Sequence, residues 1–280
     1  MRVRHVEDGP QPPFHRHSPT RPLSGCIGTN EVSGLPVRIA FAREEGTNIL
    51  IVGRSFSVAL GIFTVMLLDL TQQIISMPDR AGIHSTPPFS ILDFQSNTES
   101  RVFTDTAMSL PLPVKLERAT DTAMTSLSDL QYELARRKRE PVAPRHSKFL
   151  FLCGLQAAHA LRSRGFYAEP GINPAAAKFN GLLREGAGQG LHSIVWCNSF
   201  ANIDLTLANA LRHFSHVIVL DGAGTHDALP AEVSSGPADQ GWYVEVEHST
   251  ATRLSPYALP SASWCDAAVR SMNRSDGTGT

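Results

Sequence analysis

The sequence lacks the features that mark several large classes of protein. It has only 4 cysteines, at positions 26, 153, 197 and 265, and none of them forms a CxxC pair. A disulfide-stapled secreted scaffold and a cysteine-based zinc site are therefore not expected. Lysine and arginine together number 25 against 26 aspartates and glutamates, so the net charge favours no polyanionic partner. We expect a reducing, cytoplasmic setting.

Long hydrophobic runs are also scarce. The best candidate, residues 58–68, ends at Asp69 and is shorter than the roughly 20 residues that cross a bilayer. Residues 1–20 are rich in Arg, His and Pro and lack the apolar segment of a signal peptide. We expect no membrane insertion. We also expect a disordered tail over residues 1–35, a single domain over residues 36–268 and a flexible tail over residues 269–280.

Apolar runs that alternate with helical patterns fill the expected domain. Because the runs are apolar on both faces, they predict an α/β fold with a mostly parallel central sheet and helices on both faces. The strands are expected at residues 37–41, 48–52, 89–93, 113–117, 148–153, 191–197, 216–220 and 242–247. The helices are expected at residues 57–75, 121–138, from 157 onward, 174–185 and 203–213.

The stretch ILIVGRSFSVAL begins like a phosphate-binding strand, loop and helix. A working loop reads G-x-x-x-x-G-K-[ST], where the glycines let backbone N–H groups wrap the phosphates. Counting from Gly53, the second glycine falls on Val58, the lysine on Ala59 and the hydroxyl on Leu60. The residues that would contact phosphate and magnesium are therefore missing, while the strand, the tight turn and the buried helix are kept.

Two other chemistries remain open for this loop. An atypical nucleotide site would use Arg54, Ser55 and Ser57 as its polar contacts. The segment from Gly53 to Ser57 also lacks only the last glycine of the G-x-S-x-G nucleophile elbow. The favoured interpretation is simpler, namely that the two serines cap the helix that follows.

A hydrolase would need two further residues. Asp221 and then His226 or His248 follow the serines in the chain order of α/β-hydrolases. Asp221 precedes a glycine at the end of an apolar run, and a turn-forming role is the favoured interpretation. Cys153 and Cys197 end two expected strands, and we expect them to be small buried residues rather than metal ligands with His159 and His192.

Four segments carry a resemblance to a known family. They are GTNILIVG at 46–53, KFLFLCGLQAAHAL at 148–161, LLREGAGQGLHSIVWCNS at 182–199 and SPYALPSASW at 255–264. The sequence resembles the FtsK/SpoIIIE motor ATPases, and within them the degenerate C-terminal ATPase domains. The resemblance implies a RecA-like P-loop fold.

The resemblance also implies that ATP chemistry has been lost. The lysine position is Ala59, and the acidic pair that holds magnesium falls on Cys153 and Gly154. The sensor pair falls on Cys197 and Asn198, of which only Asn198 keeps an amide. Without the lysine, the hydroxyl and the acid, the electrostatic basis of phosphoryl transfer is gone. No bound ATP or magnesium is expected.

The implied role is structural or regulatory. The domain would pack against active motor ATPase domains of the same family in a DNA-translocase or secretion-type assembly, and the chain would be a piece of a longer motor protein. One alternative is an atypical ATP-binding DNA translocase subunit that relies on Arg54. The other is a non-hydrolysing module that binds double-stranded DNA through the basic run at 136–139.

Overall fold

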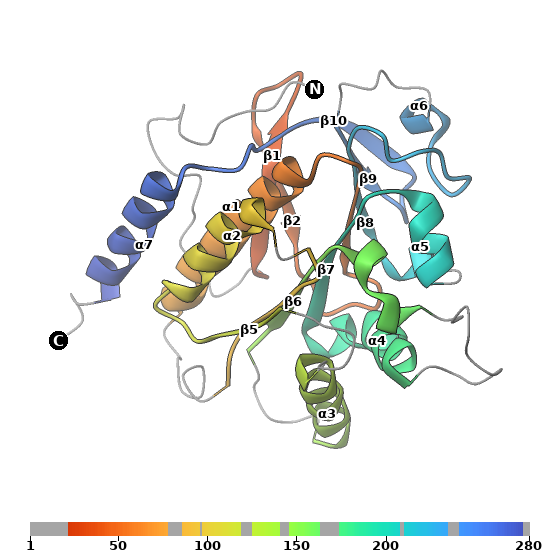
Figure 1. Ribbon diagram of the computed structural model, residues 1–280. Coiled ribbons are helices and arrows are strands. Elements are labelled where there is room, and N and C mark those ends of the chain that lie inside the picture. The colour runs from red at the N-terminus through yellow and green to blue at the C-terminus, as the bar shows by residue number, and fades with distance from the viewer. Residues whose placement is uncertain are drawn as a thin grey trace.

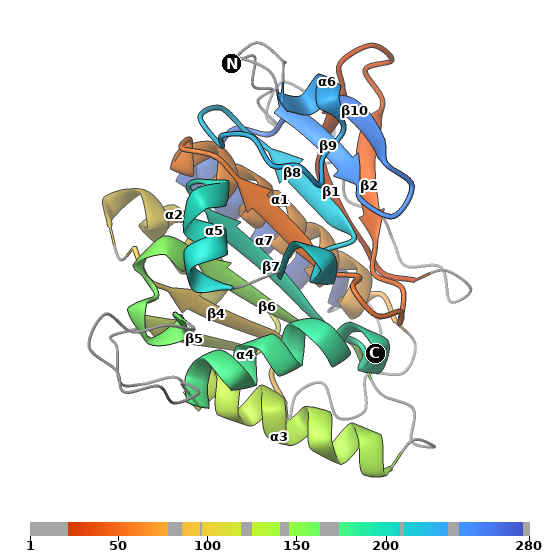
Figure 2. The same cartoon turned by 90° about the vertical axis from the view of Figure 1, so that its right-hand side faces the viewer.

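A single ten-stranded sheet forms the centre of the protein (Figures 1 and 2). The computed structural model describes residues 22–77, 86–95, 97–118, 125–140, 146–162, 174–207, 210–234 and 241–276. The strands, in chain order, are β1 (Ser24–Asn30), β2 (Pro36–Ala40), β3 (Ile49–Val52), β4 (Phe89–Asp93), β5 (Val114–Arg118), β6 (Lys148–Cys153), β7 (Leu191–Cys197), β8 (His216–Val219), β9 (Gly241–Glu245) and β10 (Thr250–Pro256).

Helices cover both faces of this sheet. The α-helices are α1 (Phe56–Ile75), α2 (Thr98–Met108), α3 (Thr125–Arg139), α4 (Pro174–Glu185), α5 (Phe200–Thr206), α6 (Ala231–Ser234) and α7 (Ala262–Asp276). Short 3-10 turns are η2 (Leu155–Ala157), η3 (His159–Leu161), η4 (Ala187–Gln189) and η5 (Ala210–His213). The predicted α/β class, with a mostly parallel sheet and helices on both sides, is confirmed.

The strands fall into a parallel block and an antiparallel block. Strands β8, β3, β7, β6, β4 and β5 lie side by side in that order, all parallel. Strands β9, β10, β1 and β2 continue the sheet beyond β8 with antiparallel pairing. The carboxyl ends of the parallel strands therefore meet at one edge, which is where ligands bind in open α/β sheets.

Alternate strand residues build two separate cores. Ile49 and Ile51 of β3 face α1, α2 and α7, whereas Leu50 and Val52 face α3, α4 and α5. Figure 2 shows α3, α4 and α5 in front of the parallel strands, with α1 and α7 behind them. This two-sided burial explains why the parallel strands are continuous apolar runs rather than alternating ones.

Helix α1 is the central helix of the fold. It runs over 20 residues, close to the predicted range 57–75, and by length and composition alone it is able to cross a membrane. In the structure, however, 94% of its most apolar window is buried inside the protein. It is a core helix, apolar on nearly every side because β-strands and other helices surround it.

The one acid in this helix is buried but paired. Asp69 has no exposed side-chain surface and forms an ion pair with Arg38 of β2. Its carboxylate also accepts a hydrogen bond from the backbone N–H of Cys26 in β1, at 3.1 Å. A buried carboxylate needs such partners, and here they tie the antiparallel block to the central helix.

Several expected boundaries were wrong. The predicted tail over residues 1–35 includes β1, whose residues 25–29 are buried between β2 and β10. The predicted tail from residue 269 lies largely inside α7, which packs Val269 and Met272 into the core. The helix expected over 203–213 is two short pieces, α5 and η5, and the one expected from 157 is a pair of 3-10 turns. Residues 121–124, the expected start of α3, lie outside the described residues.

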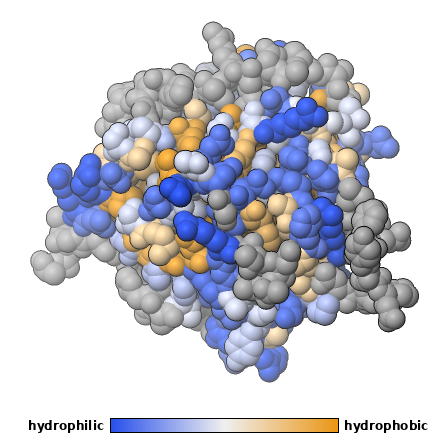
Figure 3. All heavy atoms as spheres, viewed as in Figure 1, coloured by the Kyte–Doolittle hydropathy of each residue, from blue (hydrophilic) through white to orange (hydrophobic). Residues whose placement is uncertain are grey.

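The surface mixes polar and apolar side chains. On the face shown in Figure 3, hydrophobic residues lie among hydrophilic ones. Among the described residues, the exposed large hydrophobic side chains include Val32 and Leu35, at the turn between β1 and β2, and Tyr132 in α3.

Candidate functional site

The loop at the position of a phosphate loop is very short. Residues 53–55 alone join β3 to α1. The backbone N–H of Gly53 donates to the carbonyl of Cys197 at 3.0 Å, and that of Arg54 donates to the carbonyl of Asp221 at 2.8 Å. A phosphate loop works because its N–H groups are free to face the ligand. Here the first two are bound to the ends of the neighbouring strands.

The glycine at the start of the loop has a packing explanation in this structure. Gly53 has φ of 146°, and a Cβ atom there would lie 2.5 Å from the Cβ of Leu220 and 2.9 Å from the carbonyl oxygen of Asp221. Only glycine fits such a close approach of two backbones. This contact accounts for Gly53 without any phosphate.

The two serines of the loop behave differently. The Ser55 hydroxyl donates to the Asp221 carboxylate at 2.5 Å and makes no capping bond to α1, whereas Ser57 is exposed. The expectation that both serines cap the helix is therefore wrong for Ser55. Asp221 has a larger role than the predicted turn, because it accepts from both the backbone and the side chain of the loop.

The structure assembles no hydrolase triad from the predicted residues. Ser55 contacts Asp221 directly, with no histidine between them. His226 instead lies 3.8 Å from Asp204, and His248 lies 3.6 Å from Glu245. The nucleophile-elbow interpretation is excluded by this arrangement, since a triad needs the base between the serine and the acid.

The lysine and hydroxyl positions lie in the core. The side chains of Ala59 and Leu60 have no exposed surface. One residue further, a Cβ atom at Gly61 would lie 2.4 Å from the carbonyl oxygen of Tyr257, because the segment after β10 crosses α1 there. These positions of α1 thus contact protein and have no room for a ligand.

The positions of the magnesium acid and the sensor also carry no charge. Cys153 ends β6 and Cys197 ends β7, but they point to opposite faces of the sheet. Burial raises the pKa of Cys153 well above its usual value and that of Cys197 to about 11. Both thiols are protonated at neutral pH, which makes them poor nucleophiles.

The nearby histidines do not join them. His192 stands near the start of β7, at the opposite end of that strand from Cys197, and its Nδ1 contacts the carbonyl of Thr47 at 3.0 Å. His159 lies in η3. Within the described part of the chain, no cluster of three His, Cys, Asp or Glu residues could hold a metal ion.

One carboxylate near the site was missed from the sequence. Asp93 ends β4 beside Cys153 and has no exposed surface. It accepts hydrogen bonds from the Ser100 hydroxyl at 2.9 Å and from the backbone N–H of Gln95 at 3.0 Å. The sequence pattern that could have revealed it is an apolar strand that ends in an acid. In the structure, this carboxylate stabilises the turn that leads into α2.

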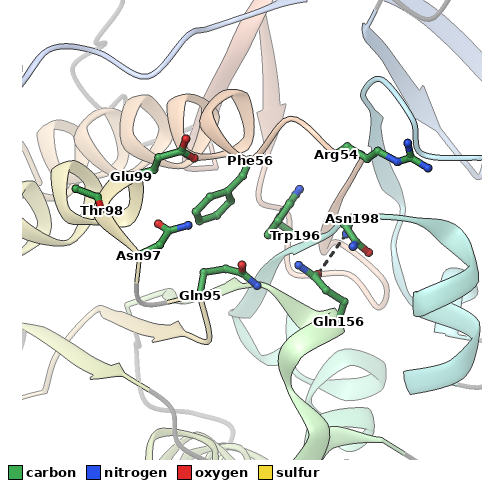
Figure 4. Close-up of a pocket in the computed structure, with 9 residues that line it drawn as sticks. All are labelled: Arg54, Phe56, Gln95, Asn97, Thr98, Glu99, Gln156, Trp196 and Asn198. Carbon is green, nitrogen blue, oxygen red and sulfur yellow. Dashed lines mark hydrogen bonds between the residues drawn. The ribbon is translucent and has the colours of Figure 1, made fainter.

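A pocket of about 500 Å³ opens at the carboxyl ends of the parallel strands. Figure 4 shows that its wall combines residues from the ends of four strands: Arg54 and Phe56 after β3, Gln95 and the start of α2 after β4, Gln156 after β6, and Trp196 and Asn198 of β7 and its loop. Of these, only Arg54 and Asn198 were singled out from the sequence.

Two aromatic rings form the back of this pocket. The rings of Phe56 and Trp196 lie 4.5 Å apart at an angle of 33°. The Trp196 indole N–H donates to the carbonyl of Gly53 at 3.0 Å. Together they fill the space in front of the loop and fix its backbone.

Arg54 lies at the rim rather than over the loop. Its side chain runs along Gly222, where a Cβ atom would be 2.7 Å from the Arg54 Cδ. Figure 4 shows the guanidinium pointing away from Phe56. The arginine therefore does not take the place of a phosphate lysine at the start of α1.

The basic run at the end of α3 is mostly neutralised within the protein. Arg136 and Arg137 both bind Glu133, at 2.9 Å and 2.7 Å, and Lys138 forms an ion pair with Glu185. Burial raises the pKa of Glu133, but the hydrogen bonds from the two arginines outweigh it and lower this pKa to about 2. Only Arg139 of the run has no acidic partner among the described residues, so three of its four cations are engaged in ion pairs within the protein.

Comparison with known proteins identifies the fold. No family profile and no curated protein sequence matches the chain. Among solved structures, the cytoplasmic domain of the type VII secretion ATPase EccC from Thermomonospora curvata superposes with a TM-score of 0.60 at 17% identity, covering 94% of this chain and 33% of that one. EssC (ATPases 2 and 3) from Geobacillus thermodenitrificans gives 0.58 at 13% identity, covering 97% and 53%.

A third similar structure is the conjugation coupling protein TcpA of pCW3, with a TM-score of 0.58 at 11% identity, covering 92% of this chain and 74% of that one. The chain spans about a third of the EccC chain and about half of the EssC chain that it matches. At these identities the likeness concerns the fold, and the chain has the RecA-like α/β fold of P-loop motor ATPases.

Proposed function

We propose that this chain is a catalytically degenerate domain of the FtsK/SpoIIIE type, with a structural or regulatory role in a motor assembly. The observation that carries the proposal is the loop after β3, whose N–H groups at Gly53 and Arg54 are bound to protein carbonyls. The burial of Ala59 and Leu60 at the lysine and hydroxyl positions supports it. The domain binds neither ATP nor magnesium and works in the cytoplasm.

Its partners are active motor ATPase domains of the same family, on the same chain or on another. Two of the similar structures are ATPase regions of secretion proteins and one is a conjugation coupling protein. A RecA-like domain without catalytic activity keeps the shape of an active domain, so it can occupy the position of one in an assembly. It would then stabilise the active domains or control the contacts between them.

The two rival functions receive less support. An ATP-driven subunit that relies on Arg54 needs the guanidinium at the loop, but it lies along Gly222. A DNA-binding module needs free cations, but Arg136, Arg137 and Lys138 are held by Glu133 and Glu185.

Steady-state hydrolysis and DNA binding separate these functions. We expect ATP turnover by the purified chain, with magnesium and double-stranded DNA, to equal that of the Arg54→Ala variant and of buffer. We also expect the natural chain not to bind double-stranded DNA. Salt-dependent binding that weakens in the double variant Arg136→Gln/Arg139→Gln would instead establish the DNA-binding module. Turnover that is lost in Arg54→Ala would establish the atypical ATPase instead.

A further inference from the structure

The pocket at the strand ends has an unusual lining for its fold, because uncharged carboxamides dominate it. Asn97, Gln156 and Asn198 come from the ends of β4, β6 and β7 and line the same space. Their orientation follows from the groups that their oxygens bind.

Each of these amide oxygens is already occupied. The Asn97 Oδ1 accepts from the backbone N–H of Ser100 at 2.9 Å, as the cap of α2. The Gln156 Oε1 accepts from the backbone N–H of Asn198 at 3.2 Å. The Asn198 Oδ1 accepts from the Asn202 amide at 2.7 Å. A backbone N–H only donates, so the first two amides have a fixed orientation.

The amide nitrogens are therefore left for a ligand. Within the described part of the chain, the NH₂ groups of Asn97, Gln156 and Asn198 make no hydrogen bond. Figure 4 shows the nitrogens of Asn97 and Gln156 pointing inward, toward the space in front of Phe56. The pocket thus offers several N–H donors, which match a ligand rich in acceptor oxygens.

Charge sets a limit on that ligand. Arg54 is the only cation and Glu99 the only anion among the residues that line the pocket, so the lining is neutral overall. A ligand with one negative charge suits one arginine and several amides, whereas a polyphosphate would bring several charges with nothing to neutralise them. The ring of Phe56 supplies an apolar wall for the rest of the ligand.

We propose that this pocket binds a monocarboxylate that carries an apolar group. The carboxylate accepts from the Gln156 and Asn97 amides, and its apolar group packs on Phe56. The source is either a free small acid or the carboxyl end of a polypeptide. This site does not depend on the role of the domain in an assembly.

Calorimetric titration of the purified chain with phenylacetate tests this proposal, with phenylacetamide as the uncharged control. We expect phenylacetate to bind and phenylacetamide to bind at least about tenfold more weakly, because the amide has lost the charge that strengthens each hydrogen bond. The peptide acetyl-Gly-Gly-Phe with a free carboxyl end, set against its amidated form, distinguishes the two sources. Tighter binding of the free-ended peptide than of phenylacetate would assign the site to a chain end.

Three isosteric variants make the test specific. Gln156→Glu and Asn97→Asp keep the oxygen that accepts the backbone N–H but turn the donor into an anion, so each should weaken binding about tenfold or more. Glu99→Gln removes the opposing charge and should tighten binding several-fold. Thermal unfolding of each variant confirms that it is folded.

Equal binding of phenylacetate and phenylacetamide, no binding of either acid, or unchanged affinity in Gln156→Glu and Asn97→Asp would overturn the proposal. Pyrophosphate provides the link to the proposed function. If pyrophosphate binds more tightly than phenylacetate, both this inference and the loss of nucleotide binding are wrong. If neither binds, only this inference fails.

Discussion

At the scale of single residues, the turn after β3 is held by contacts that the protein makes with itself. Gly53 accommodates the approach of β8, Asp221 receives the Ser55 hydroxyl, and the Trp196 indole binds the Gly53 carbonyl. The first two N–H groups of the loop are bound by protein carbonyls and are not available to a phosphate. These internal contacts, more than the absence of one lysine, are the reason why nucleotide binding is not expected.

The Ser55 contact predicts a difference between the two serines. Ser55→Ala removes a hydrogen bond to a carboxylate and should lower the free energy of unfolding by about 2 kcal/mol. Ser57→Ala, at an exposed position, should change it by less than about 0.5 kcal/mol. Urea unfolding followed by circular dichroism measures both, and equal effects would show that Asp221 does not hold the loop.

His192 makes the stability depend on pH. Burial lowers the pKa of this imidazole from 6.5 to about 4, against a smaller opposite effect of the Thr47 carbonyl. The unfolded chain takes up a proton below pH 6.5 that the folded protein does not, so stability is complete above pH 6.5 and falls as the pH drops toward about 4. The loss for this group is about 3 kcal/mol.

Urea unfolding at several pH values between 7 and 4 tests this assignment. In His192→Phe the ring contacts with Phe41 and Phe149 remain available. The free energy of unfolding lost between pH 7 and 4 should be smaller in this variant by about 3 kcal/mol. His248→Gln, at an exposed position, is the control and should keep the decline. An unchanged profile in His192→Phe would assign it to other groups.

The residues of the loop and those of the pocket differ in how far the sequence predicts them. Counting from Gly53 assigned Ala59 and Leu60 to the helix after the loop, and both lie in α1, because spacing along one helix is local. Gln95, Asn97 and Gln156 were not predicted. They follow strands far apart in the chain, and the sequence does not say which strands become neighbours in the sheet.

At the scale of elements, continuous apolar runs identified the parallel strands well. β3, β4, β6 and β7 were predicted to within a residue because both of their faces are buried. β1 and β10 were missed. β1 contains two glycines and β10 is partly exposed and ends in proline, so neither has the composition of a core strand, and their pairing partners stabilise them instead.

The attachment of the antiparallel block predicts a large effect of one substitution in α1. Asp69→Ala leaves Arg38 without its partner in a mostly buried place, and we expect a loss of about 3 kcal/mol in the free energy of unfolding. Asp105→Ala, on the exposed side of α2, should cost less than about 0.5 kcal/mol. Chemical unfolding of both variants is the measurement, and a loss below 1 kcal/mol for Asp69→Ala would mean that the pair does not tie β1 and β2 to α1.

At the scale of the whole molecule, the architecture follows from how the strands and helices pack. The sheet order, the two cores and the buried α1 are those of a RecA-like domain, and structural comparison agrees. In the proposed degenerate domain, buried Ala59 and Leu60 and the thiols of Cys153 and Cys197 stand at the positions aligned with the phosphate lysine, the hydroxyl, the magnesium acid and the sensor. Core packing alone accounts for the strand, loop and helix formed by β3, residues 53–55 and α1, because the loop and α1 are part of the core.

Equilibrium binding of a fluorescent ATP analogue, with magnesium, tests the central claim most directly. The account predicts no binding to the natural chain below millimolar concentration, and no rescue in Ala59→Lys/Leu60→Thr, because both positions are buried and the substitutions should destabilise the core instead. Micromolar binding that is lost in Arg54→Ala would contradict it and reveal a nucleotide site rebuilt around that arginine.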